Sequence, residues 1–124
     1  MSLILIVEDN EQNMKLARDV LQAKGYTTLE AVTGEEGVKL AQERKPDLVL
    51  MDIQLPGING VEALQRLRAD PQTTKIPVMA LTASVMQADR AQFTAAGFDA
   101  FVSKPISLRE FLTAVQQLLQ GSAK

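Results

Sequence analysis

Residues 48–60 read LVLMDIQLPGING, in which four apolar residues are followed by one carboxylate and a glycine-containing turn. Short continuous apolar runs of this kind are typical of parallel strands that are covered on both faces. A second run, from Leu3 to Val7, has the same character and is followed by Glu8 and Asp9. The stretch therefore predicts a buried parallel strand, and it raises the question of why Asp52 follows directly on it.

The composition describes a soluble globular chain with few kinds of reactive group. The 124 residues, 46% of them hydrophobic and 23% charged, suffice for one domain that needs no disulfide or metal to hold its core. Because cysteine and histidine are absent, any chemistry has to depend on carboxylates, hydroxyls, lysines and backbone groups. The net charge of -2 argues against a nucleic-acid partner. The first apolar run is too short to span a membrane and has no basic leader, so we expect a cytoplasmic protein.

Apolar runs alternate with helical segments along the chain. Strands are predicted at Leu3–Val7, Thr27–Ala31, Leu48–Met51, Val78–Leu81 and Ala100–Ser103. Helix starts are predicted at Asn10 and at the capping-box sequences Thr33–Glu36, Ser84–Gln87 and Ser107–Glu110, and helix ends at Gly25 and Gly97. Five strand–helix units in series predict an α/β, flavodoxin-like, doubly wound (βα)5 sandwich: a five-stranded parallel sheet with helices on both faces.

Polar residues follow four of the predicted strands at their carboxyl ends. These are Glu8–Asp9 after the first strand, Asp52 after the third, Thr82 after the fourth and Lys104–Pro105 after the fifth. With the strand order 2-1-3-4-5, the first and third strands are neighbours and the three carboxylates converge where such sheets bind ligands. Clustered acids repel one another, and a hard cation such as Mg²⁺ or Mn²⁺ relieves the repulsion. With an ammonium and a hydroxyl nearby, Asp52 becomes a candidate nucleophile that forms an acyl phosphate.

Each of these features alone has an ordinary structural explanation. Glu8–Asp9 fits a solvated strand end and helix cap, Asp52 with its Pro-Gly turn fits turn chemistry, and Lys104–Pro105 fits a loop. Their coincidence at the same end of four parallel strands favours a functional site.

These motifs resemble the response-regulator receiver domain, the CheY-like family of two-component signalling. The resemblance covers essentially the whole chain and rests on LILIVEDN (3–10), LVLMDIQLPGINGVE (48–62), PVMALTA (77–83) and AGFDAFVSKPIS (96–107). The sequence looks closest to stand-alone single-domain regulators of the DivK type. It implies one receiver domain over residues 1–124 and no output domain.

The resemblance also implies a role for each acidic residue. Asp52 would accept a phosphoryl group from a phosphohistidine. Asp9 and Asp52 would bind Mg²⁺ directly, Glu8 would bind it through water, and the backbone carbonyl of Gln54 would complete the protein ligands.

A second group of residues would act on the phosphoryl group and transmit the signal. Thr82 would donate a hydrogen bond to a phosphoryl oxygen, and Lys104, aimed by a cis peptide bond to Pro105, would pair with another. Phe101 would turn from exposed to buried, although the pattern alone favours a simply packed strand residue. The surface that changes would comprise the fourth helix, the fifth strand and the fifth helix.

The expected partners are proteins. A histidine kinase, a histidine phosphotransferase or both would dock on the first helix, where Met14 and Leu16 must divide between core and interface. A downstream protein target or kinase would receive the signal, with no nucleic acid or membrane involved, from a monomer or a weak phosphorylation-dependent dimer. The chain would catalyse phosphoryl transfer to, and hydrolysis from, its own Asp52 without acting as an enzyme on a separate substrate.

Three alternative functions fit the sequence less well. A phosphatase with an aspartate nucleophile usually has a second acid two residues later, where this sequence has Gln54. A flavodoxin-like cofactor binder needs a phosphate loop after the first strand, where EDNEQN (8–13) would repel an anion. A receiver that binds partners without phosphorylation usually lacks the acidic pair, the acceptor or the lysine, all of which are present.

Overall fold

The computed structural model describes residues 2–53, 55, 57–82, 95–103 and 108–122. Within these ranges the elements are β1 (Leu3–Val7), α1 (Glu11–Ala23), β2 (Thr27–Ala31), α2 (Gly34–Arg44), β3 (Leu48–Asp52), α3 (Gly60–Ala69), β4 (Val78–Thr82), β5 (Ala100–Ser103) and α5 (Leu108–Ser122). Residues 95–96 form a helical end before β5, and the rest of the helix predicted after β4 lies outside the described residues. No described helix is long and apolar enough to cross a membrane.

The five strands form one parallel sheet in the order β2-β1-β3-β4-β5, which confirms the predicted topology. Two strands run one residue further than predicted. Asp52 still pairs with Leu81, and Thr82 with Ser103, because the ladder is made by backbone groups and continues beneath polar side chains.

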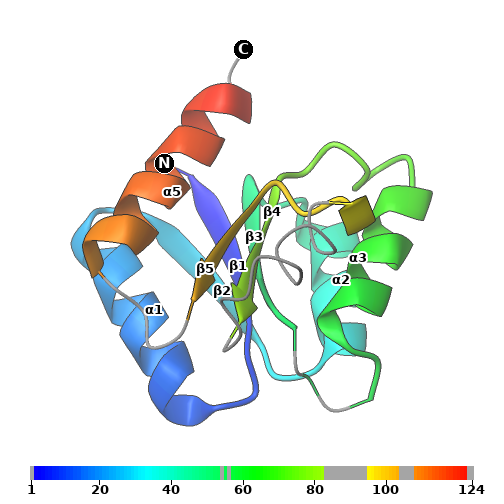
Figure 1. Cartoon of the computed structure of the whole chain (residues 1–124), viewed down its shortest axis with the longest axis horizontal. Coiled ribbons are helices and arrows are strands. Elements are labelled where there is room, and N and C mark those ends of the chain that lie inside the picture. The colour runs from blue at the N-terminus through cyan, green and yellow to red at the C-terminus, as the bar shows by residue number, and fades with distance from the viewer. Residues whose placement is uncertain (1, 54, 56, 83–94, 104–107, 123–124) are drawn as a thin grey trace.

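Helices cover both faces of the sheet, with α1 and α5 on one side and α2 and α3 on the other (Figure 1). Successive strand residues alternate between the two cores. Residues packed with α2 and α3 include Leu5, Val7, Val49, Met51 and Ala80. Residues packed with α1 and α5 include Ile4, Ile6, Leu50, Met79 and Leu81. The inner strands β1 and β3 are therefore apolar on both faces, whereas the edge strand β2 carries exposed polar residues at Thr27 and Glu30.

The helix starts follow the predicted capping residues with one difference. The Asn10 side chain accepts from the backbone N–H groups of two residues in the first turn of α1, and the Thr33 hydroxyl accepts from the Glu36 N–H at 3.1 Å. The Glu36 carboxylate does not close the predicted capping box on Thr33, since it accepts from the Val32 N–H at 3.1 Å. Gly25 ends α1 at a φ of 90°, as predicted. The capping boxes predicted at Ser84 and at Ser107 begin outside the described residues.

One guanidinium joins the end of α3 to the segments that lead into β4 and β5. Arg68 donates from Nη1 to the carbonyl oxygens of Thr74 at 3.0 Å and Ile76 at 2.7 Å. From Nη2 it donates to the carbonyl oxygen of Gly97 at 3.1 Å and to Asp99 Oδ2 at 2.9 Å. The planar fork of an arginine suits several acceptors at once, which a lysine ammonium cannot match in this geometry.

We therefore expect Arg68→Lys to lower the free energy of unfolding by about 1–3 kcal/mol, because partly buried carbonyl groups lose their donor. Arg66→Lys, at an exposed position of the same helix, should change it by less than about 0.5 kcal/mol. Urea unfolding of the two variants measures this difference, and equal midpoints would contradict the role given to Arg68.

Candidate functional site

Two of the predicted acids are brought together by the pairing of β1 with β3. In that register Val7 lies opposite Met51, so that Glu8 and Asp52 follow side by side. The Glu8 N–H donates to the Ala31 carbonyl at 2.9 Å, which fixes the backbone just beyond β1. Both residues thus lie at the carboxyl ends of the two central strands. Figure 1 shows these strand ends toward the lower part of the molecule.

The three carboxylates of Glu8, Asp9 and Asp52 each offer an oxygen, and these oxygens all lie within 4.8 Å of one another. Glu8 and Asp52 are almost fully buried, with 1% and 3% of their surface exposed, whereas Asp9 is exposed. Oxygens bound to one Mg²⁺ ion at its usual distance lie about 2.9–4.2 Å apart, so a small contraction of the cluster suffices. The residues therefore fit a hard divalent cation that keeps part of its water shell on the Asp9 side.

The backbone that follows Asp52 folds back tightly on the end of β3. The Ile53 N–H donates to the Leu81 carbonyl at 3.1 Å, and the Gly60 N–H donates to the Ile53 carbonyl at 2.9 Å. A Cβ atom on Gly60 would collide with the Asp52 carbonyl oxygen and lie 2.8 Å from Ile53 Cα. Only glycine lets α3 begin this close to the end of β3.

The remaining predicted site residues are only partly covered by the structure. Thr82 is the last residue of β4, next to the strand that carries Asp52, and its side chain is not described. Gln54, Lys104 and Pro105 lie outside the described residues, so their assigned roles, including the cis peptide bond, stay predictions.

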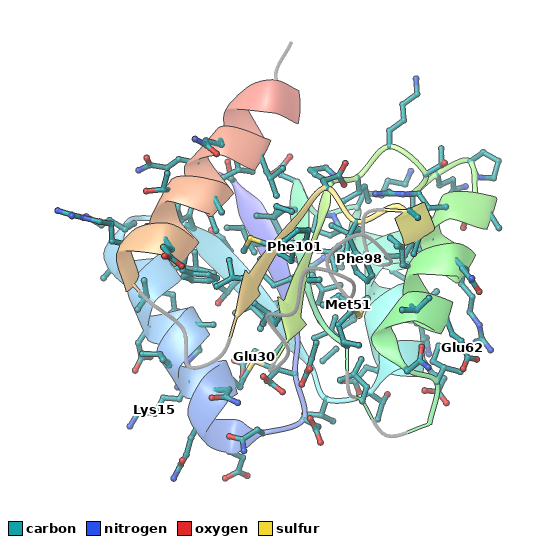
Figure 2. All side chains as sticks on the ribbon, viewed as in Figure 1. Lys15, Glu30, Met51, Glu62, Phe98 and Phe101 are labelled. Atoms are coloured by element: carbon teal, nitrogen blue, oxygen red, sulfur yellow. The ribbon has the colours of Figure 1, made fainter. Side chains whose placement is uncertain are left out.

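Phe101 lies on β5, where it pairs with Ala80. Its side chain is half-buried and packs against the core shared with α2 and α3, which also contains Met51 and Phe98 (Figure 2). This position is intermediate between the exposed and buried states that the resemblance implies. The switching role of Phe101 stays a prediction.

A cleft of about 370 Å³, which the sequence did not reveal, opens beside the acidic cluster. Its lining comes from the end of β1, from α1 and from the end of β2, and comprises Glu8, Asp9, Glu11, Met14, Lys15, Arg18, Glu30 and Val32. Figure 2 shows Lys15 and Glu30 toward the lower end of the molecule. Arg18 crosses the cleft to Glu30 at 3.4 Å, and its pKa is raised by a hydrogen bond to Asp19 and by the charge of Glu30. The periodicity of α1 could have indicated this face, but not its contact with β2.

On α1, Met14 and Leu16 have different environments, which the sequence alone did not predict. Met14 is buried in the core against β1 and β3, together with Ala17 and Leu21. Leu16 is 38% exposed on the outside of α1. Among the described residues it is one of two large apolar side chains exposed to solvent, the other being Val32 beside the cleft.

Comparison with known proteins agrees with this fold and identifies the family. Residues 4–116 match the response regulator receiver domain, and the chain belongs to that family. It is 45% identical over 116 residues to the polar-differentiation response regulator DivK of Brucella anthropi, a match that covers 94% of each chain. DivK proteins of Brucella ovis and Brucella suis match to the same extent.

Two solved structures are also similar. The receiver domain of a sensor histidine kinase from Pseudomonas aeruginosa superimposes with a TM-score of 0.89 at 31% identity, covering 96% of this chain and 98% of that one. That domain holds a magnesium ion coordinated in its active-site cleft. A CheY-like receiver domain protein from Methanospirillum hungatei gives a TM-score of 0.88 at 26% identity, covering 99% and 97%. The chain is thus a two-component response-regulator receiver, a phosphoryl-acceptor switch, as the resemblance implied.

The crowding of three carboxylates predicts a stability effect that can be measured without phosphorylation. Two unit charges 4.8 Å apart repel by about 1 kcal/mol in water and by about 3 kcal/mol at an effective dielectric constant of 20. We expect Asp52→Asn to raise the free energy of unfolding in EDTA by about 1–3 kcal/mol, and to reduce the gain that Mg²⁺ gives the unaltered chain.

Thermal unfolding with and without Mg²⁺ measures both effects. Glu43→Gln, which removes an exposed acid from α2, serves as the matched control and should shift stability by less than about 0.5 kcal/mol. If the Asp52→Asn chain in EDTA is no more stable than the unaltered chain, the repulsion inferred from the geometry is wrong.

Proposed function

We propose that Asp52 is the residue that accepts the phosphoryl group, in a step that requires Mg²⁺ held by Asp9, Asp52 and, through water, Glu8. The observation that supports this most directly is the cluster of three carboxylate oxygens within 4.8 Å of one another. One of them belongs to Asp52, the last residue of the fully buried strand β3. The donor is a phosphohistidine of a kinase or phosphotransferase, the class of partner that the family implies.

The reaction that these residues support is a direct transfer. An Asp52 carboxylate oxygen bonds to phosphorus as the P–N bond of the phosphohistidine breaks, and the donor imidazole keeps the electron pair. When bound, the metal ion neutralises charge on the phosphoryl oxygens. Burial of Asp52 and Glu8 lowers the local dielectric constant, which strengthens each of these electrostatic contacts.

Two further residues are proposed to complete the site. Thr82, at the end of the adjacent strand, donates to one phosphoryl oxygen, and Lys104 pairs with another. Hydrolysis of the acyl phosphate by water, catalysed by the same site, returns Asp52 to its free carboxylate and resets the switch.

The output is proposed to leave through the face formed by β5, α5 and the helix before β5. Phe101 is half-buried on β5, which pairs with the strand that ends in Thr82. We infer that an inward shift of Thr82 is accompanied by burial of the Phe101 ring. The ring has no hydroxyl group whose burial would need a partner. Phosphorylation then biases an equilibrium between two states of this surface.

The first testable consequence is metal-dependent labelling. We expect the chain incubated with acetyl phosphate and Mg²⁺ to gain the mass of one phosphoryl group, whereas Asp52→Asn and samples in EDTA gain none. Intact-mass spectrometry measures the adduct. A chain that stays unlabelled under conditions that label another receiver would favour the alternative of a module that binds partners constitutively.

We also propose that the histidine donor docks on the exposed side of α1, where Leu16 provides an apolar contact beside the acidic cleft. Apolar residues at the centre of an interface commonly carry much of the binding energy. Lys15, exposed on the same helix and lining the cleft, supplies a nearby positive charge.

Docking and chemistry can be separated by changing Leu16. We expect Leu16→Glu to slow transfer from any phosphohistidine donor that labels the unaltered chain, by at least about tenfold. Labelling by acetyl phosphate should stay within about twofold, because this small donor needs no docking surface. Gln42→Glu adds the same charge to an exposed position of α2, across the sheet, and should change neither rate. An equal loss with both donors would place Leu16 in the chemistry or the fold instead.

A further inference from the structure

The first turn of α2 holds the turn that follows the acceptor strand. Glu35, exposed at the start of α2, accepts a hydrogen bond from the Ile58 N–H to its Oε1 at 3.4 Å. Gly57, at a φ of 75°, has no side chain to collide with the same carboxylate. A Cβ atom there would lie 2.7 and 2.8 Å from the two Glu35 carboxylate oxygens. The carboxylate therefore lies directly on the turn between β3 and α3.

A second contact closes the same junction from the neighbouring residue. Gly34 is buried against Ile58, and a Cβ atom on Gly34 would lie 2.7 Å from Ile58 Cγ1 and 2.8 Å from the Ile58 carbonyl oxygen. Two consecutive residues of α2 thus fix one residue of the turn, one by packing and the other by a charged acceptor. At 3.4 Å the hydrogen bond is long and lies in an exposed position, so the turn is restrained by this contact together with the packing of Gly34 and the close approach of the carboxylate to Gly57.

The restrained turn leads directly back to Asp52. Gly60, two residues after Ile58, donates its N–H to Ile53 at 2.9 Å and packs against the Asp52 carbonyl group. A displacement of Ile58 would be passed along this short segment to the end of β3. The predicted carbonyl ligand Gln54 belongs to the same turn and lies outside the described residues.

We propose that Glu35 is a positioning residue for the phosphoryl site: through Ile58 it holds the turn after Asp52 in the geometry that binds the metal ion. This inference rests on the proposed function, because it concerns the metal affinity of that site. Glu35 touches neither the phosphoryl group nor the metal ion. It acts through the backbone of residues 57–60.

A simpler role for Glu35 would be its charge at the start of a helix, where acids are generally favourable. Glu36, in the same turn, distinguishes the two roles. Glu36 carries the same charge as Glu35 in the same helix. Its carboxylate, however, accepts a hydrogen bond from the Val32 N–H instead of from the β3–α3 turn. A general effect of charge should be shared by both residues, whereas a positioning effect should belong to Glu35 alone.

The test is the rate of labelling of the full chain by acetyl phosphate, measured across a series of Mg²⁺ concentrations. We expect Glu35→Ala to raise the Mg²⁺ concentration that gives half the maximal rate by about threefold to tenfold, since it removes one charge-assisted restraint on the site. Glu35→Gln keeps an acceptor oxygen and should stay within about twofold of the unaltered chain, as should Glu36→Ala.

The remaining outcomes each decide between explanations. The positioning role would be overturned if Glu35→Ala left the half-maximal Mg²⁺ concentration unchanged, or if Glu36→Ala shifted it equally. It would also be overturned if Glu35→Gln raised that concentration as much as Glu35→Ala does. Thermal unfolding of all three variants shows whether they are folded at the assay temperature. If the unaltered chain itself is not labelled, the proposed function fails, whereas a labelled chain with no Glu35 effect leaves that function intact.

Discussion

The pairing of β1 with β3 at the centre of the sheet is the constraint on which the site depends. It places Glu8 and Asp52 next to each other with almost no exposed surface, at the end of strands that are buried on both faces. Two carboxylates in such a position cost folding free energy unless a cation or donor compensates them. The strands beneath the two carboxylates contribute an uninterrupted apolar core on each side of the sheet, and this core fixes the strand ends that bring the carboxylates together.

Burial gives the same acids their chemical use. A carboxylate in an apolar setting interacts strongly with a cation, so binding of a divalent ion offsets the repulsion that folding leaves behind. Asp9, the exposed member of the cluster, is the one through which a bound ion would be reached from solvent. Within the described part of the chain, an opening to the site lies beside α1, at the cleft that Arg18 and Glu30 cross.

The sequence predicted the elements, the strand order and the acidic cluster, because apolar runs and polar residues at strand ends are local signals. The sequence-based prediction ended β3 at Met51, because a polar residue after an apolar run usually marks the end of a strand. In the structure the backbone pairing continues through Asp52. The sequence could not separate Met14 from Leu16, because both are apolar and only the packing of α1 decides which faces the core. The contact of Glu35 with Ile58, 23 residues apart, carries no sequence signal of its own.

Different contacts hold the two sides of Asp52. On the α3 side, glycines at 34 and 60 allow contacts that a Cβ atom would forbid, and the Glu35 carboxylate lies against the turn. On the other side, β4 is buried and Phe101 is half-buried on the edge strand β5. Close packing resists small displacements, so the contacts of α2 with the β3–α3 turn would oppose a movement of that turn when Asp52 changes. Loosening that turn would therefore let it take up part of a movement that the proposed switch directs toward β4 and β5.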